Sequence, residues 1–127
     1  MKVSSQATSL FETFSNGVPP AGCPSRIVLD HVTSRWGVLI LIALSQGTLR
    51  WSQLRRRADG ISEKMLAQTL QTLERDGFVH RDAKPVIPPR VDYSLTPRGK
   101  EIVALLIPLM EWIVANADEI VSAPEDA

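Results

Sequence analysis

The sequence predicts a mainly α-helical fold that carries one small β-hairpin. Leu66, Leu70 and Leu73 recur at the spacing of one helix face, whereas Val91–Leu95 alternates apolar and polar residues as a strand does. The chain has 127 residues, of which 44% are hydrophobic and 22% are charged. This balance suits a single globular domain with a modest core.

Short helices are predicted for the first half of the chain. Residues 1–22 form a weakly patterned N-terminal extension, in which Leu10, Phe11 and Phe14 could share one helix face. Pro24 suits the first turn of the next helix. Thr33 or Ser34 can cap a following helix, whose apolar face is Trp36, Leu39, Ile40, Ala43 and Leu44. A short extended link (48–50) and a helix at about 51–58 come next.

The helix predicted from Ser62 to about Asp76 has two distinct faces. Ser62 can cap its N-terminus, and Gly77 ends it. The leucine stripe points toward the core. The opposite stripe contains no acidic residue and consists of Lys64, Gln68, Gln71 and Arg75. Long donor-rich side chains of this kind can read the edges of guanine and adenine.

A two-stranded hairpin follows, with strands at 78–82 and 91–95 and an eight-residue loop at 83–90. Three prolines stiffen the loop, and Lys84 and Arg90 are expected to be the charges at its tip. Thr96 and Pro97 begin a last helix, which runs to about Val121 and which Pro108 is expected to bend. This order of elements is that of a winged helix-turn-helix, whose wing would lie along a phosphate backbone.

The zero net charge hides an uneven distribution. Residues 48–100 carry eleven basic and six acidic side chains, a net of +5, and the remaining residues have a net of −5. A basic middle between acidic ends suits docking onto nucleic acid. The alternative is that these charges are scattered by chance on solvated helices. The same alternative applies to Arg55–Arg57, because at most two of three consecutive helical residues can face one ligand.

Several motifs in a fixed order resemble the HxlR-type transcriptional regulators, winged-helix proteins related to MarR proteins. The resemblance runs from Cys23 to about Trp112. It is carried by Cys23-Pro24, Trp36, Trp51–Leu54 (WSQL), Gly60–Ser62 (GIS), Leu73–Val79 (LERDGFV) and Pro88–Gly99 (PPRVDYSLTPRG). The resemblance implies a homodimer that binds a pseudo-palindromic DNA operator, with recognition helices in successive major grooves.

The expected DNA contacts follow from this docking, because the N-terminal half of a recognition helix enters the groove deepest. Lys64 and Gln68 are expected to read bases, and Arg75 lies too far along to reach them. The full set of expected DNA-binding residues is Arg50, Arg55, Ser62, Lys64, Met65, Gln68, Thr69, Gln71, Lys84 and Arg90.

The last helix carries two neighbouring apolar stripes, more than a small domain needs to cover one face. The sequence therefore predicts that the N-terminal and C-terminal helices form a dimer interface; a helix buried inside a monomer is the alternative. The expected interface residues are Ile102, Leu106, Leu109, Met110 and Ile113. The winged-helix domain would span 23–122, with the recognition helix at 62–76, the wing at 78–96, the dimerisation helix at 97–121 and a tail at 123–127.

Cys23 is the only cysteine, so any disulfide must join two chains or a small thiol. Some HxlR-type proteins use a cysteine at this place to sense quinones, aldehydes or oxidants. A thiol at a helix start lies beside unpaired N–H groups that favour the thiolate, and Arg26 could add to this effect. A small buried apolar residue is the other interpretation.

Other kinds of site find little support in the sequence. His31 and His80 lack partners at metal-ligand spacing and are expected to be structural or surface residues. Trp36 and Trp51 are expected in the core, whereas Trp112 could serve a dimer or a ligand cavity. The sequence contains no phosphate loop and no nucleophile elbow, so an enzyme is not expected. No cofactor is expected either.

The longest apolar runs have nine residues, which is short of the ~20 needed to cross a bilayer. A cytoplasmic location is expected. A winged-helix module for protein–protein contact, and control by a small-molecule inducer, stay open as alternatives.

Overall fold

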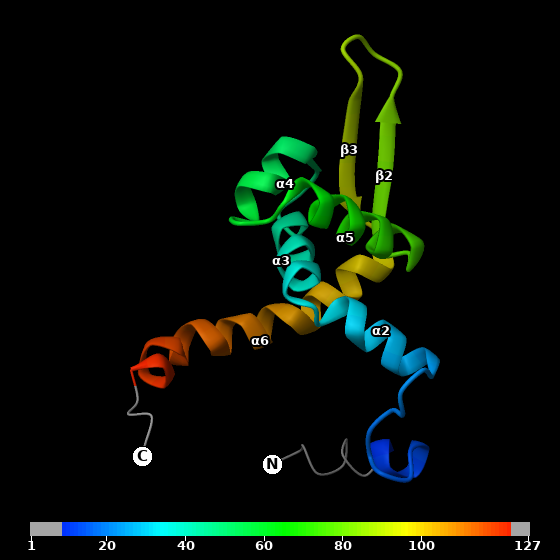
Figure 1. The fold of residues 1–127 in the computed structure, drawn as a ribbon, viewed down its shortest axis with the longest axis vertical. Helices are drawn as coiled ribbons and strands as arrows, with labels where there is room; N and C mark the ends of the chain where they lie inside the picture. Colours follow the sequence, from blue (N-terminus) through cyan, green and yellow to red (C-terminus); the bar gives the residue numbers. More distant parts are fainter. Residues whose placement is uncertain (1–8, 123–127) are drawn as a thin grey trace.

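The computed structural model describes residues 9–122 (Figure 1). Its elements in chain order are α2 (Pro24–Val32), α3 (Arg35–Leu44), β1 (Leu49–Arg50), α4 (Trp51–Arg57), α5 (Glu63–Arg75), β2 (Val79–Lys84), β3 (Arg90–Leu95) and α6 (Pro97–Val121). This order confirms the winged helix-turn-helix. The predicted tail and the first eight residues of the extension lie outside the described range, and residues 9–13 are helical.

Hydroxyl caps fix the starts of three helices. The Oγ of Ser34 accepts a hydrogen bond from the Gly37 N–H at 3.1 Å, and the Oγ of Ser62 accepts one from the Met65 N–H at 3.0 Å. Thr96 caps α6 in the same way. Each cap satisfies one of the N–H groups that a helix start leaves unpaired. The caps predicted at Ser62 and Thr96 are confirmed, and Ser34 rather than Thr33 caps α3.

The core lies where α3 and α5 meet the sheet. Leu66, Leu70 and Leu73 of α5 are buried, as predicted from their stripe. The prediction for α3 needs correction, because Leu41 is fully buried while Leu39 is only half-buried. The reason is that α3 contacts α4, α5, α6 and β3, so more than one of its faces is covered.

The three strands form an antiparallel sheet in the order β1-β3-β2. The register pairs Leu49 with Tyr93, and it pairs β2 with β3 from Val79–Leu95 to Lys84–Arg90. The hairpin ladder is therefore longer than predicted, and the loop shrinks to residues 85–89. Lys84 and Arg90 form the last rung rather than the tip. The tip itself is apolar, with Ile87 fully exposed.

α6 continues through Pro108 as one helix. Val103 and Leu106 of its first half are buried in the core. Leu106, predicted at a dimer interface, is thus covered within its own chain because α6 packs on α3 there. The second half of α6 extends away from the other elements (Figure 1). Among residues 9–122, no single helix is long and apolar enough to cross a membrane; only α2 and α3 together, bent by 67°, meet such a test.

Candidate nucleic-acid interface

The face of α5 opposite the leucine stripe is open to solvent. Lys64, Gln68, Gln71 and Arg75 are exposed, and Met65 beside them is 38% exposed. Thr69 differs, because it is half-buried in a small hollow of about 160 Å³ that also contains Asp30, His31 and Ser34. The exposed donor stripe therefore forms as predicted, while Thr69 borders α2 and α3.

The other predicted contacts on the helix-turn-helix are already engaged within the chain. The hydroxyl of Ser62 caps α5, and Arg55 Nη1 lies 3.3 Å from Glu63 Oε1 across the turn. Both side chains of this ion pair are largely exposed, so water screens the pair and it is weak. Glu63 therefore restrains the Arg55 side chain only weakly.

Two aspartates hold the basic residues of the wing. Lys84 Nζ donates to Asp82 Oδ2 at 2.6 Å, and this hydrogen bond lowers the pKa of Asp82 below its ordinary value. Arg90 Nε lies 3.4 Å from Asp92 Oδ1. Asp82 and Asp92 face each other in the β2–β3 register. Like charges at such positions repel, and their basic partners offset this repulsion.

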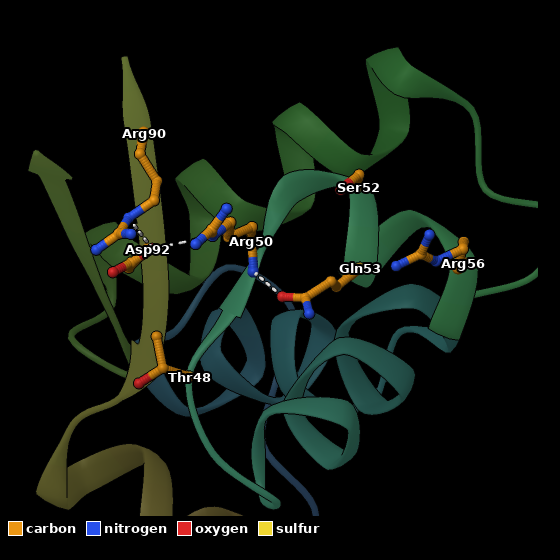
Figure 2. A pocket seen from close by; sticks show the side chains of 7 residues that line it. All are labelled: Thr48, Arg50, Ser52, Gln53, Arg56, Arg90 and Asp92. Atoms are coloured by element: carbon orange, nitrogen blue, oxygen red, sulfur yellow. Dashed lines mark hydrogen bonds and ion pairs between the residues drawn. The ribbon is translucent and has the colours of Figure 1, made fainter. Parts of the chain in front are cut away.

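A hollow of about 490 Å³ lies where β1, α4 and β3 meet (Figure 2). We call it the arginine pocket; it is lined by Thr48, Arg50, Ser52, Gln53, Arg56, Arg90 and Asp92. Arg50 and Arg90 both turn toward Asp92, and Arg56 reaches in from α4 (Figure 2). The sequence predicted contacts at Arg50 and Arg90 but missed the pocket. The pairing of β1 with β3 creates it, and a two-residue strand gives no periodic signal.

The C-terminal end of α5 is held from two sides. His31 Nδ1 lies 2.6 Å from Asp76 Oδ2, which joins α2 to the C-cap of α5. From the other side, Arg98 donates to the Asp76 carbonyl at 3.2 Å and Thr96 donates to the Gly77 carbonyl. His31 is thus a structural residue, as predicted. Among residues 9–122, no three His, Cys, Asp or Glu side chains are grouped to hold a metal ion.

A family described as HxlR-like helix-turn-helix matches residues 31–121. The chain belongs to this family. It is 57% identical over 104 residues to the uncharacterized HTH-type transcriptional regulator YtfH of Escherichia coli, a match that covers 82% of each chain.

Solved structures agree with this assignment. A protein from Salmonella typhimurium, provisionally named as the transcriptional regulator YtfH, is 55% identical with a TM-score of 0.77. The match covers 81% of this chain and 92% of that one. The redox regulator HypR in its oxidised form is 33% identical with a TM-score of 0.69, over 74% of this chain and 97% of that one.

Cys23 of this HxlR-like protein is the N-cap residue of α2 and is half-buried. Its carbonyl accepts the first hydrogen bond of the helix, from the Ile27 N–H at 3.1 Å. Arg26 does not stand free beside it, because the guanidinium donates to the Pro19 carbonyl and lies 3.9 Å from Asp30. These two groups therefore engage the guanidinium that was expected beside the thiol.

Large apolar side chains are exposed on both helices that flank the DNA-binding elements of this HxlR-like chain. On α6 the residues Leu105, Leu109, Trp112 and Ile113 are exposed on one side of the helix, and we call them the α6 strip. Leu105, Leu109 and Trp112 recur at helical spacing and are 71%, 51% and 59% exposed. Ile27, Val28 and Leu29 of α2 are also exposed. Of the predicted interface residues, Leu109 and Ile113 are exposed, while Ile102 and Met110 are half-buried.

Proposed function

We propose that this HxlR-like protein is a cytoplasmic, sequence-specific DNA-binding transcriptional regulator. The observation that carries the proposal is the exposed face of α5, where Lys64, Gln68 and Gln71 stand together without an acidic residue. A module for protein contact would present an apolar or acidic face instead. Lys64 and Gln68 read base edges, and Met65 contacts a thymine methyl or a phosphate. Arg50, Arg55 and the basic residues of the wing contact the backbone.

The regulator acts as a homodimer on a pseudo-palindromic operator. The α6 strip supports this part of the proposal, because contiguous exposed apolar side chains commonly mark a protein–protein interface. Two copies related by twofold symmetry would present their recognition helices to half-sites one helical turn apart.

Control of DNA binding is proposed to act at Cys23, through oxidation or electrophile modification. Two observations support it: the thiol stands at the N-cap of α2, and the structurally similar HypR is a redox regulator. Modification would shift the dimer toward arrangements in which the two α5 helices no longer fit both half-sites. A small-molecule inducer is the alternative form of control.

The test of DNA reading is a selection from a pool of random duplexes with the purified protein. Enrichment of a motif with twofold symmetry is expected. A pool that stays random after repeated rounds would contradict sequence-specific binding.

Control by the thiol is tested by titrating the selected duplex before and after diamide, with Cys23→Ser alongside. We expect oxidation to weaken binding of the wild type only. Equal binding of both proteins in both states would remove the thiol switch and leave the inducer.

A further inference from the structure

We propose that the arginine pocket binds one phosphate of the duplex backbone, with Arg56 as a contact that complements Arg50 and Arg90. This inference rests on the proposed function and adds to it a defined phosphate site. The sequence-based set of DNA contacts contains neither Arg56 nor Ser52, which line the pocket beside Arg50.

The charge of the pocket is unbalanced. Three arginines line it against a single carboxylate, that of Asp92. Arg50 and Arg90 share one oxygen of that carboxylate, at Nε–Oδ1 distances of 3.9 Å and 3.4 Å. Charge-assisted hydrogen bonds are about 2.7–2.9 Å long, so neither contact is a full hydrogen bond. An anion with more acceptor oxygens would bind these guanidinium groups better than Asp92 does.

The Nε of Arg90 gives a second reason to expect a ligand. This atom is buried, and within residues 9–122 it has no hydrogen-bond partner. Leaving a buried donor without a hydrogen bond is unfavourable, and more so for a charged group. A phosphate oxygen that displaces the Asp92 carboxylate could accept a hydrogen bond from this nitrogen, and the Ser52 hydroxyl lining the pocket could donate a further one.

The position of the arginine pocket favours a phosphate of the DNA backbone as its ligand. The pocket lies between α4, the first helix of the helix-turn-helix, and β3, a strand of the wing (Figure 2). In helix-turn-helix complexes the first helix crosses the DNA backbone beside the groove that the recognition helix enters. Asp92 then acts as a positioning residue, which holds Arg50 and Arg90 toward the pocket until a phosphate takes its place.

The test is the salt dependence of affinity for a random-sequence duplex, measured for the wild type, Arg56→Gln and Arg57→Gln. Arg57 is the matched control, since it is the next residue of α4, is also exposed and does not line the pocket. Losing one phosphate contact makes the negative slope of log K against log salt shallower by about 0.9 per protomer. We expect this loss for Arg56→Gln and a wild-type slope for Arg57→Gln.

Equal slopes for both variants would overturn the proposal. That result differs from failure of the proposed function, in which the wild type itself would show no salt-dependent binding to duplex DNA. Thermal unfolding of Arg56→Gln and of Arg57→Gln tests whether each variant is folded.

Free inorganic phosphate could also bind the arginine pocket. A second experiment distinguishes it from a phosphate of the DNA backbone. The unfolding temperature is compared in phosphate and in chloride at equal ionic strength, without DNA. A phosphate-dependent rise that Arg56→Gln abolishes, with an unchanged slope on DNA, would assign the pocket to free phosphate and overturn the DNA assignment.

Discussion

Asp82 and Lys84 show how single residues order the wing. The hydrogen bond from Lys84 lowers the pKa of Asp82, so the folded protein favours the carboxylate more than the unfolded chain does. The resulting stabilisation is present at pH values above the ordinary Asp82 pKa of 3.8 and is lost as the pH falls through the lower, folded value.

We expect the substitution Lys84→Met to raise the pKa of Asp82 toward its ordinary value, because it removes the largest cause of the shift. The measurement is an NMR titration of the Asp82 carboxyl group in both proteins. A control substitution, Lys100→Met, lies on α6 and should leave the titration unchanged. An identical Asp82 titration in Lys84→Met would show that Lys84 does not hold this carboxylate.

The helix caps could be predicted from residue type, whereas the positions of the basic residues in the hairpin could not. Ser62 and Thr96 were predictable as caps, because a hydroxyl followed by a helical pattern satisfies N–H groups within three residues. Lys84 and Arg90 were expected at the tip, but they form the last rung of the ladder. Where a hairpin stops pairing depends on contacts across the two strands, which the local sequence does not display.

At the scale of elements, the contact between His31 and Asp76 joins α2 to the recognition helix. α2 buries only Val32, and this contact is one of its links to α5. The acidic side chain at the C-terminus of α5 is unfavourable for the helix dipole, and the His31 ring offsets this.

We expect His31→Ala to lower the free energy of unfolding by about 1 kcal/mol, given that the contact is partly exposed to water. Urea unfolding of His31→Ala, of Asp76→Asn and of the double variant His31→Ala/Asp76→Asn measures the coupling energy between the two side chains. Because the two side chains are in contact, we expect the double variant to lose less than the sum of the single losses. Strict additivity would show that the two side chains act independently.

The predictability of an element depended on how many of its sides are covered. α5 has one buried face and one exposed face, so periodicity identified both. α3 is covered by several elements, and the single apolar face predicted for it therefore missed the fully buried Leu41. The same limit applied to α6, where the two apolar stripes did not reveal that Leu106 belongs to the core of its own chain.

At the scale of the whole molecule, the exposed α6 strip supports the proposed homodimer. We expect Leu109→Glu to convert the proposed dimer to monomer, because it would place a charge in the proposed interface. Sedimentation velocity measures the change, with Glu111→Gln on an exposed neighbouring position as the control. A Leu109→Glu protein that sediments like the wild type would place the interface elsewhere.

Leu106 provides a contrast on the same helix. Its side chain is 5% exposed within the chain, so Leu106→Ala should cost about 2–5 kcal/mol of folding free energy by leaving a cavity. Concentration-dependent urea unfolding separates this loss from a loss of dimerisation, which varies with protein concentration. An unchanged unfolding midpoint for Leu106→Ala would contradict its place in the core.

The site as a whole was only partly predictable. The donor face of α5 was visible in the sequence because Lys64, Gln68 and Gln71 all lie on one helix. The arginine pocket joins residues of α4 with Arg90 and Asp92, more than thirty positions away in the chain. Only the pairing of β1 with β3 brings these groups together, and that pairing is a long-range contact.

The central claim, that α5 reads DNA sequence, is tested most directly with Lys64→Ala. Its affinity is measured for the selected duplex and for a random duplex, with Arg75→Ala as the control from the far end of the same face. We expect Lys64→Ala to lose about 1–3 kcal/mol of discrimination between the two duplexes and Arg75→Ala to keep it. Equal losses on both duplexes for Lys64→Ala would contradict base reading by this helix.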